Sequence, residues 1–344
     1  MKKNYFRVGI AGYGVVGKKR RVCIDSNSNL KVVAVCDQTF SSSGIMDDGV
    51  KYYSEYKQLI KNENLDILFV CMTNDILPEA TIFALENNLH VFCEKPPGRT
   101  VDDIVNVRKI EAKYPDLKLM YGFNHRYHDS ILDAMHILNS GNLGSVINLR
   151  AVYGKAKLIT FNQDDWRTKR VRSGGGVLLD QGIHMVDLLR LFGGDYRTVY
   201  SIVSNDFWNF DVEDNAYALM KTDSGVVAML HSSATSWKHT FRLEITTEKG
   251  GISLNGILSG SKSYGSETMT VTYANPDDDN GDPRDQTTSY KIDPSWDNEV
   301  TAFVKYIKED KVVSSGSSLD ALKTMELVFK IYASDTDWKN KYNI

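Results

Sequence analysis

Short apolar runs alternate with amphipathic helical patterns through the first third of the chain. The apolar runs are Arg7–Ala11, Lys31–Cys36, Asp66–Met72, His90–Cys93 and Lys118–Gly122, and the helical patterns are Val15–Asp25, Ser54–Asn62, Glu79–Asn87 and Val101–Tyr114. Strands that alternate with helices are typical of βαβ units, whose strands pair in parallel. The pattern therefore predicts a doubly wound α/β domain over residues 1–123.

The pattern changes after Asn124. Strict alternation of apolar and polar residues appears in Val146–Val152, Thr198–Ser204, Ala216–Thr222, Val226–Ser232, Phe241–Thr246 and Thr268–Tyr273, and helical patterns cover Asp129–Ser140, Val177–Leu191, Trp296–Glu309 and Ser318–Ser334. Alternation with period two indicates strands with one buried face. We expect an α+β domain over residues 124–344, with an open and mostly antiparallel sheet.

Length and composition are consistent with two globular domains. A chain of 344 residues exceeds the usual size of a single core, and its 42% hydrophobic content is enough to fill two. A net charge of −3 gives no reason to expect nucleic acid or an anionic membrane as a partner. No apolar run approaches the ~18 residues of a membrane span. These features predict a soluble, cytoplasmic protein.

The four cysteines and the acidic loop favour no metal site. Cys23, Cys36, Cys71 and Cys93 contain no C-x-x-C pair and lie in or near apolar runs, so we expect reduced core thiols. The Asp-rich stretch Asn275–Gln286 fails the spacing of a calcium-binding loop and is interpreted as a polar loop.

A glycine motif follows the first apolar run. Gly12, Gly14 and Gly17 form G-x-G-x-x-G between a predicted strand and a predicted helix. In a Rossmann domain these glycines allow the tight turn, the approach of a pyrophosphate and close packing of the helix. Asp37 ends the next strand, twenty residues after Gly17, where a carboxylate binds ribose hydroxyls. Residues Gly12, Tyr13, Gly14, Val15, Val16, Gly17 and Asp37 are therefore predicted to bind a dinucleotide.

The charges near this motif address the choice of cofactor. The carboxylate of Asp37 would repel a 2′-phosphate, so NAD is favoured over NADP, although NADP is not excluded. The run Lys18–Arg21 follows in the same helix. Such a run is usually a solvated helix face, but one of its cations could reach a phosphate.

Two further places carry candidate chemistry. Lys95 follows the fourth apolar run, and strand ends face the ligand crevice in a doubly wound sheet. Asp180, His184 and Asp187 are spaced to lie on one face of an otherwise apolar helix. Ionisable residues in such a helix need either polar partners or a function. A cluster of satisfied structural residues and a catalytic site are both open on this pattern alone.

At this point the sequence resembles the Gfo/Idh/MocA family of sugar and inositol dehydrogenases, which includes glucose-fructose oxidoreductase. The resemblance spans nearly the whole chain and is carried by Gly12–Gly17, His90–Pro96, Gly122–Tyr127, Trp166-Arg167, Gly174–Asp187 and Glu213–Ala216. One loop departs from the family pattern, because Asn74 follows Thr73 where proline is common and Pro78 replaces a frequent histidine. The departure affects contacts expected near the nicotinamide and leaves the fold unaffected.

The resemblance implies roles for particular residues. Lys95, Asp180 and His184 correspond to the family's catalytic set. His184 would exchange the hydroxyl proton, Lys95 would stabilise charge on the reacting oxygen, and Asp180 would bind a hydroxyl or tune His184. Further cofactor contacts are expected at Thr73, Asn74, Glu94 and Lys95. Substrate contacts are expected at Lys95, Asn124, Arg126, Tyr127, Trp166, Arg167, Asp180 and His184.

These expectations define an NAD(P)-dependent sugar dehydrogenase or reductase. It would transfer hydride between the nicotinamide and a secondary alcohol or ketone of a sugar, free or nucleotide-linked. Two alternatives keep the cofactor: a glycosidase that oxidises and re-reduces its substrate in one cycle, and a non-catalytic NAD-binding regulator. Retention of Lys95, Asp180 and His184 counts against the regulator. The resemblance also implies a homodimer or homotetramer, formed by pairing of exposed sheet faces.

Overall fold

The computed structural model describes residues 5–157, 166–259, 264–275, 281 and 283–344. The chain forms two compact units. The first contains Met1–Asn124, Val171–Gly174 and Trp296–Leu322, and the second contains His125–Arg170, Gly175–Ser295 and Lys323–Ile344. The sequence pattern predicts a single domain boundary, after residue 123. The units of the structure differ from that division, because two later segments return to the first unit.

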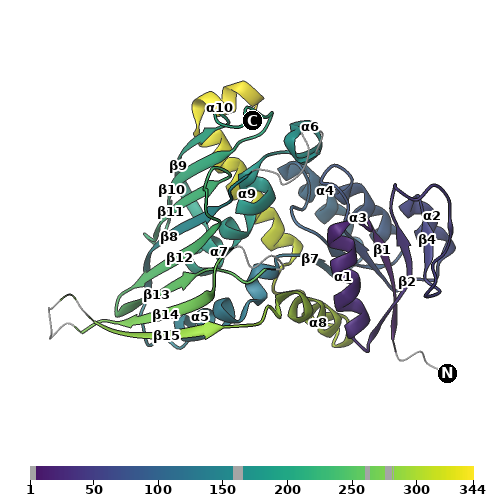
Figure 1. Ribbon diagram of the computed structural model, residues 1–344, viewed down its shortest axis with the longest axis horizontal. Coiled ribbons are helices and arrows are strands. Elements are labelled where there is room, and N and C mark those ends of the chain that lie inside the picture. Colours follow the sequence, from purple (N-terminus) through teal and green to yellow (C-terminus); the bar gives the residue numbers. More distant parts are fainter. Residues whose placement is uncertain (1–4, 158–165, 260–263, 276–280, 282) are drawn as a thin grey trace. The chain divides into compact units, whose positions relative to one another are not determined.

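The first unit is built on a seven-stranded sheet of order β3-β4-β2-β1-β5-β6-β7 (Figure 1). Its strands are β1 (Phe6–Ala11), β2 (Leu30–Cys36), β3 (Gly44–Ile45), β4 (Lys51–Tyr53), β5 (Ile67–Val70), β6 (His90–Cys93) and β7 (Leu119–Tyr121). Its strands pair in parallel, except for the short β3, which pairs with β4 in antiparallel orientation. β5 is buried at all four positions, as expected for a strand covered on both faces. The predicted doubly wound domain is confirmed.

The helices of this unit begin and end close to the predicted positions. They are α1 (Val15–Ser26), α2 (Tyr56–Asn62), α3 (Leu77–Glu86), α4 (Val101–Glu111) and α8 (Ser295–Lys308). α4 starts with a capping box: the side chain of Thr100 accepts from the backbone N–H of Asp103, and the carboxylate of Asp103 accepts from the backbone N–H of Thr100. α8 packs its Phe303 against Phe69 and Phe92 of the sheet, with ring centroids 6.2 and 5.6 Å away.

The second unit contains an eight-stranded sheet of order β15-β14-β13-β12-β8-β11-β10-β9. Its strands are β8 (Val146–Gly154), β9 (Tyr196–Ser204), β10 (Asn215–Thr222), β11 (Val227–Ser233), β12 (Thr240–Thr247), β13 (Gly250–Asn255), β14 (Glu267–Tyr273) and β15 (Arg284–Tyr290). All pairs are antiparallel except β8 with β11. The mostly antiparallel sheet is confirmed.

Helices cover only one face of this sheet (Figure 1). They are α5 (Asp129–Asn139), a wide π turn (Leu178–Gly182) that leads into α7 (Ile183–Gly193), and α9 (Ser318–Ser334), which continues from the first unit. Shorter elements are the 3₁₀ turns Asn124–Tyr127 and Trp166–Thr168, α6 (Arg170–Ser173) and α10 (Thr336–Tyr342). Residues along the strands alternate between buried and exposed, as the sequence predicted. In β10, for example, buried and exposed residues alternate from Ala216 to Thr222.

Two of the predicted elements need correction. The helix expected over Val177–Leu191 begins with the π turn, so it is not one regular α-helix. The stretch Asn275–Gln286 was expected to be a loop, but β15 begins at Arg284; residues 276–280 and 282 lie outside the described part of the chain. β15 is exposed at almost every position, so its sequence lacks the alternation of apolar and polar residues by which a strand is predicted.

The run Lys18–Arg21 is not a solvated helix face at Arg20. This side chain is fully buried, and its Nε donates to Glu94 at 2.6 Å while a terminal nitrogen lies 2.8 Å from Glu299. Its guanidinium also lies 4.4 Å from the ring centroid of Phe92 and 4.1 Å from that of Trp296. Arg20 therefore connects α1, the end of β6 and α8 inside the first unit.

Replacing Arg20 with methionine should lower the free energy of unfolding by about 3–5 kcal/mol, because it leaves Glu94 and Glu299 buried without their cation. Urea unfolding followed by circular dichroism measures the change. Lys18→Met, in the same helix but exposed, is the matched control and should stay within about 0.5 kcal/mol of the wild type. Equal stability of both variants would contradict the importance of this buried cation.

Candidate functional site

The residues predicted to hold a dinucleotide gather at the carboxyl edge of the parallel sheet. The sheet bonding continues past the strand ends: Gly12 N donates to Cys36 O at 2.8 Å, Cys71 N to Ala11 O at 2.6 Å and Glu94 N to Val70 O at 2.9 Å. β1 has β2 on one side and β5 on the other, so the chain direction of the crossovers reverses at β1. Ligands of doubly wound sheets bind at this switch point.

The three glycines of the motif have different reasons to lack a side chain. Gly12 adopts φ +91°, and a Cβ there would lie 2.3 Å from Cys71 O. A Cβ on Gly17 would lie 1.9 Å from Gly12 O. Both glycines are thus required by the fold itself. A Cβ on Gly14 would meet nothing within 4 Å, so Gly14 leaves open space at the start of α1, which suits the approach of a pyrophosphate to a helix N-terminus.

Asp37 is tied to the glycine loop. Its Oδ2 accepts from Tyr13 N at 2.8 Å, and its Oδ1 accepts from the backbone and hydroxyl of Thr39 at 3.0 and 2.8 Å. Oδ2 accepts only one of these bonds, so its second lone pair leaves room for a ribose hydroxyl. The half-buried carboxylate is fixed at the position where the sequence motif expected it.

Other residues expected to contact the cofactor serve the local structure. Glu94 is 7% exposed and its carboxylate is bonded to Arg20. The side-chain amide of Asn74 donates to Ser173 O at 2.8 Å, and the carbonyl of Thr73 accepts two backbone bonds at the start of α3. Lys95 follows β6 and is half-buried. Contacts of these four residues with a cofactor stay predictions.

In the second unit, the carboxylate of Glu213 anchors the start of the helix that carries Asp180 and His184. Glu213 is fully buried and accepts from Gly176 N at 2.7 Å, Leu178 N at 2.9 Å and the hydroxyl of Tyr332 at 2.6 Å. Burial raises the pKa of this carboxyl, against the opposing effect of the nearby Arg170 and of the hydrogen bonds. A Cβ on Gly176 would lie 2.0 Å from Glu213 O. Gly176 is therefore needed for close packing on Glu213.

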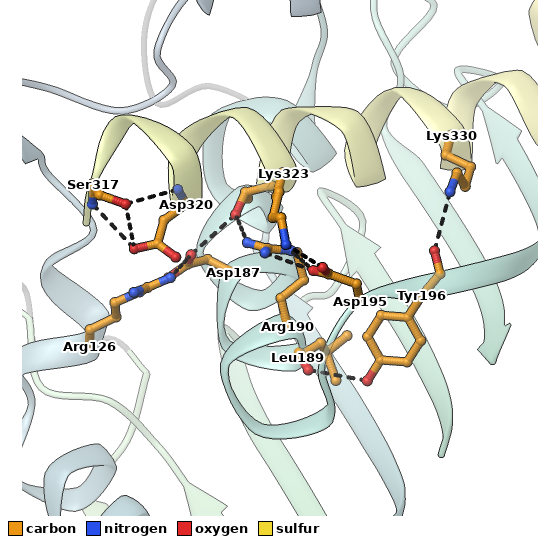
Figure 2. A network of polar contacts seen from close by, with 11 residues as sticks. Arg126, Asp187, Leu189, Arg190, Asp195, Tyr196, Ser317, Asp320, Lys323 and Lys330 are labelled. Atoms are coloured by element: carbon orange, nitrogen blue, oxygen red, sulfur yellow. Dashed lines mark hydrogen bonds and ion pairs between the residues drawn. The ribbon is translucent and has the colours of Figure 1, made fainter. Parts of the chain in front are cut away.

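Asp187 forms a structural ion pair. The sequence had left both a structural and a catalytic role open for the polar residues of this helix. Arg126 forms two parallel bonds to its carboxylate, both 2.7 Å long, and both side chains are buried (Figure 2). Thr324 donates to Asp187 at 3.2 Å and accepts from Arg190 at 3.0 Å, which extends the network to α9. Arg126, which was predicted to touch substrate, is thus bound to Asp187 inside the second unit.

Asp180 lies in the π turn, between two cations. Lys155 Nζ is 3.6 Å from one carboxylate oxygen and Arg167 Nε is 3.7 Å from the other. The Arg167 guanidinium lies 4.5 Å from the ring centroid of Trp166, so this predicted substrate pair is in contact with itself and with Asp180. Lys155 was missed by the sequence interpretation. Its signal was its position directly after the strand that ends at Gly154.

His184 lies against a second imidazole that the sequence interpretation also missed. The rings of His184 and His125 are stacked, with centroids 3.9 Å apart and planes at 12°. His125 Nε2 is 3.0 Å from the hydroxyl of Tyr153 in β8. All three side chains are buried, as are the predicted substrate contacts Asn124 and Tyr127 in the same 3₁₀ turn as His125. The structure therefore brings Asp180, His184, Trp166 and Arg167 together with Lys155 and His125 in one unit.

Two other kinds of site are absent from the part of the chain that the structure describes. Within them, no group of three or more histidine, cysteine, aspartate or glutamate side chains is arranged to hold a metal ion. Their helices also include none with the length and apolar character needed to cross a membrane. The four cysteines are free thiols, three of them buried.

Comparison with known proteins agrees with the two units. A family model described as "Oxidoreductase family, NAD-binding Rossmann fold" matches residues 6–123, and one described as "GFO/IDH/MocA C-terminal domain" matches residues 131–253.

Among curated proteins, the chain is 24% identical to inositol 2-dehydrogenase of Salmonella paratyphi B, over 74% of this chain and 75% of that protein. It is also 24% identical to D-xylose 1-dehydrogenase (NADP(+)) 2 of Haloferax volcanii, over 94% and 96%. Among solved structures, levoglucosan dehydrogenase in complex with NADH superposes with a TM-score of 0.84 at 18% identity, over 97% of this chain and 98% of that chain. This last likeness supports the fold.

Gly14→Val should weaken NADH binding by about a hundredfold or more while leaving thermal unfolding unchanged, because the new side chain fills open space at the pyrophosphate approach. Isothermal titration calorimetry and a melting curve measure the two effects. Gly17→Val is the contrasting variant: its side chain meets backbone, so the protein should melt early. Unchanged NADH affinity in folded Gly14→Val would contradict the assignment of this loop to phosphate binding.

Proposed function

Because the chain belongs to the GFO/IDH/MocA oxidoreductase family, we propose that it transfers hydride between NAD and a secondary alcohol or ketone of a sugar. Family membership follows from the two family models, which together match most of the chain, and it makes the first unit an NAD-binding Rossmann domain. The observation that carries the proposal is His184, a buried imidazole on a helix anchored at its start by Glu213.

The chemistry assigns one task to each proposed catalytic residue. Oxidation of a secondary alcohol removes a hydride from carbon and a proton from the hydroxyl, and bound NAD supplies the hydride acceptor. His184 takes the proton, since imidazole titrates near neutrality, and returns it in the reverse direction. Lys95 donates a hydrogen bond to the reacting oxygen and stabilises the negative charge that develops there.

Asp180 is proposed to orient the substrate. A carboxylate accepts hydrogen bonds from sugar hydroxyls, and Lys155 and Arg167 hold this one from both sides. Trp166, stacked on Arg167, adds an aromatic face beside the same group. The proposed substrate contacts are therefore Lys95, Asn124, Tyr127, Trp166, Arg167, Asp180 and His184. Arg126 stays a further predicted substrate contact, and its ion pair with Asp187 positions the turn that carries it.

The proposal that the substrate is a sugar rests on the names of the curated relatives. Proteins with similarity over most of the chain are named as inositol and xylose dehydrogenases, which act on polyhydroxylated substrates. A free sugar, an inositol and a nucleotide-linked sugar are distinguished by a substrate panel. NAD is proposed as the preferred cofactor, because Asp37 occupies the position at which a 2′-phosphate would be repelled.

A second copy of this chain is the proposed partner. The uncovered face of the eight-stranded sheet exposes Tyr200, Ile202, Tyr217, Leu219 and Met229, each at least 46% accessible. An open hollow of about 640 Å³ lies among them. An apolar sheet face of this kind, centred in three neighbouring strands, favours face-to-face pairing of two identical sheets in a dimer.

Lys95→Ala and His184→Ala should each lower the rate of hydride transfer by about 10²–10⁴-fold, while melting temperature and NADH affinity stay close to those of the wild type. Single-turnover absorbance at the nicotinamide band, with a panel of sugars, inositols and nucleotide-linked sugars, measures the loss. Net NADH formation distinguishes a dehydrogenase from a redox-neutral glycosidase. If both variants turn over normally when folded, the catalytic assignment is wrong; if no substrate turns over, a regulatory role gains support.

Ile202→Glu together with Met229→Glu should convert the protein from a dimer to a monomer, because four carboxylates would meet in the paired sheets. Light scattering after size exclusion reports the mass. Val312→Glu replaces an exposed apolar residue of the first unit and should leave the dimer intact. A wild-type protein that is already monomeric at micromolar concentration would contradict the proposed partner.

A further inference from the structure

His125 is the most unexpected neighbour of the proposed base. Its ring is almost parallel to that of His184, and the two side chains are 8% and 5% exposed. Both come from elements of the second unit: His125 lies in the 3₁₀ turn Asn124–Tyr127 and His184 lies in the first turn of α7. A ring stacked at this distance restricts the rotation of its neighbour.

Two contacts hold His125 in place. Its Nε2 is 3.0 Å from the Tyr153 hydroxyl, and the next residue, Arg126, clamps the same 3₁₀ turn to α7 through Asp187 (Figure 2). Asp187 lies three residues after His184, so this clamp joins the backbone segments of the two imidazoles. The stack is therefore fixed from both sides by bonds that do not involve His184 itself.

The hydrogen bond to Tyr153 sets the protonation of His125. Burial raises the pKa of Tyr153 well above its usual value, so the phenol keeps its proton. The phenol oxygen lies 3.0 Å from Nε2 of His125, which gives its O–H group an acceptor in this imidazole. An imidazole that accepts at Nε2 carries its proton on Nδ1 and is neutral.

We propose that His125 is a positioning residue for His184: as the neutral member of a stacked imidazole pair, it orients the base and leaves the pair's single proton to His184. The inference rests on the proposed role of His184 as the base. Two imidazolium charges in buried, contacting rings repel strongly, so the pair binds one proton before any second. Tyr153 determines which ring is the acceptor.

Other charged and titratable groups surround the pair in the second unit. The charged neighbours are compensated in pairs: Asp180 by Lys155 and Arg167, Asp187 by Arg126, and Glu267 by His128, whose ring is 5.5 Å from that of His125. The neutral phenol of Tyr264 contacts Tyr153. Among the titratable groups named here, the ring of His125 is the one stacked directly against His184.

The test combines two readouts on the full-length protein. Histidine labelled with ¹³C and ¹⁵N reports the tautomer and titration of each of the seven imidazoles. In the wild type, we expect His184 to titrate while His125 stays neutral with its proton on Nδ1. In Tyr153→Phe, His125 should begin to take up the proton, and the His184 midpoint should fall by about half a pH unit or more. Tyr264→Phe, which removes a neighbouring phenol, is the control and should change neither.

Kinetics provide the second readout. Hydride transfer requires neutral His184, so the rate falls as the pH drops through its pKa, and in Tyr153→Phe this fall should move to lower pH. His125→Ala should lower kcat by about tenfold to a hundredfold with unchanged NADH affinity, and His125→Phe, which restores a stacked ring, should recover most of it.

The outcomes separate the two proposals. A wild-type protein in which His125 and His184 each bind a full proton near neutrality would overturn the inference, as would a Tyr153→Phe variant with unshifted titration and rate profile. A His125→Ala variant with normal kcat would also overturn it. Normal hydride transfer by His184→Ala would instead overturn the proposed function, because the base itself would then be misassigned.

Discussion

The hydrogen bonds to the buried carboxylate of Glu213 are the constraint on which the second unit's polar cluster depends. Two backbone N–H groups at the start of the helix and the hydroxyl of Tyr332 converge on it, in a space from which water is excluded. Removing the carboxylate would leave several buried donors without an acceptor, at about 1–3 kcal/mol each. The approach also requires Gly176, since any side chain there meets the backbone of Glu213. Two stretches far apart in the sequence are thus needed together to place Asp180 and His184.

The architecture was largely predictable because its elements carry strong periodic signals. The fully apolar run that became β5 and the alternating run that became β10 could each form only one kind of strand. Three of the missed strands lack such signals: β15 is exposed at almost every position, and β3 and β4 are two and three residues long. The π turn at Leu178–Gly182 was also out of reach, because local spacing does not reveal an extra residue in a turn.

The sequence predicted many residues of the candidate site, but it did not predict which of their side chains contact one another. The motif already assigned different roles to Gly12, Gly14 and Gly17, but only the folded backbone shows which atoms exclude a side chain at Gly12 and Gly17. Charge patterning placed Arg20 on a solvated face, although it is buried between two carboxylates supplied from 74 and 279 residues further along the chain. The stacked His125 had no motif of its own, because ring stacking depends on tertiary contact alone. Contacts between side chains that are far apart in the sequence leave no local pattern from which they could be predicted.

The return of α8 to the first unit bears on how such a chain can change during evolution. Phe303 completes the aromatic cluster beneath the parallel sheet, and Glu299 balances Arg20 from the same helix. A gene segment cut after Asn124 would carry the glycine motif and every parallel strand, yet it would leave a buried arginine half-neutralised and an apolar surface bare. The nucleotide-binding unit is therefore not a contiguous cassette. Recombination that moved it into another protein would succeed only as an insertion that keeps both ends, with new substrate-binding sequence exchanged in the middle.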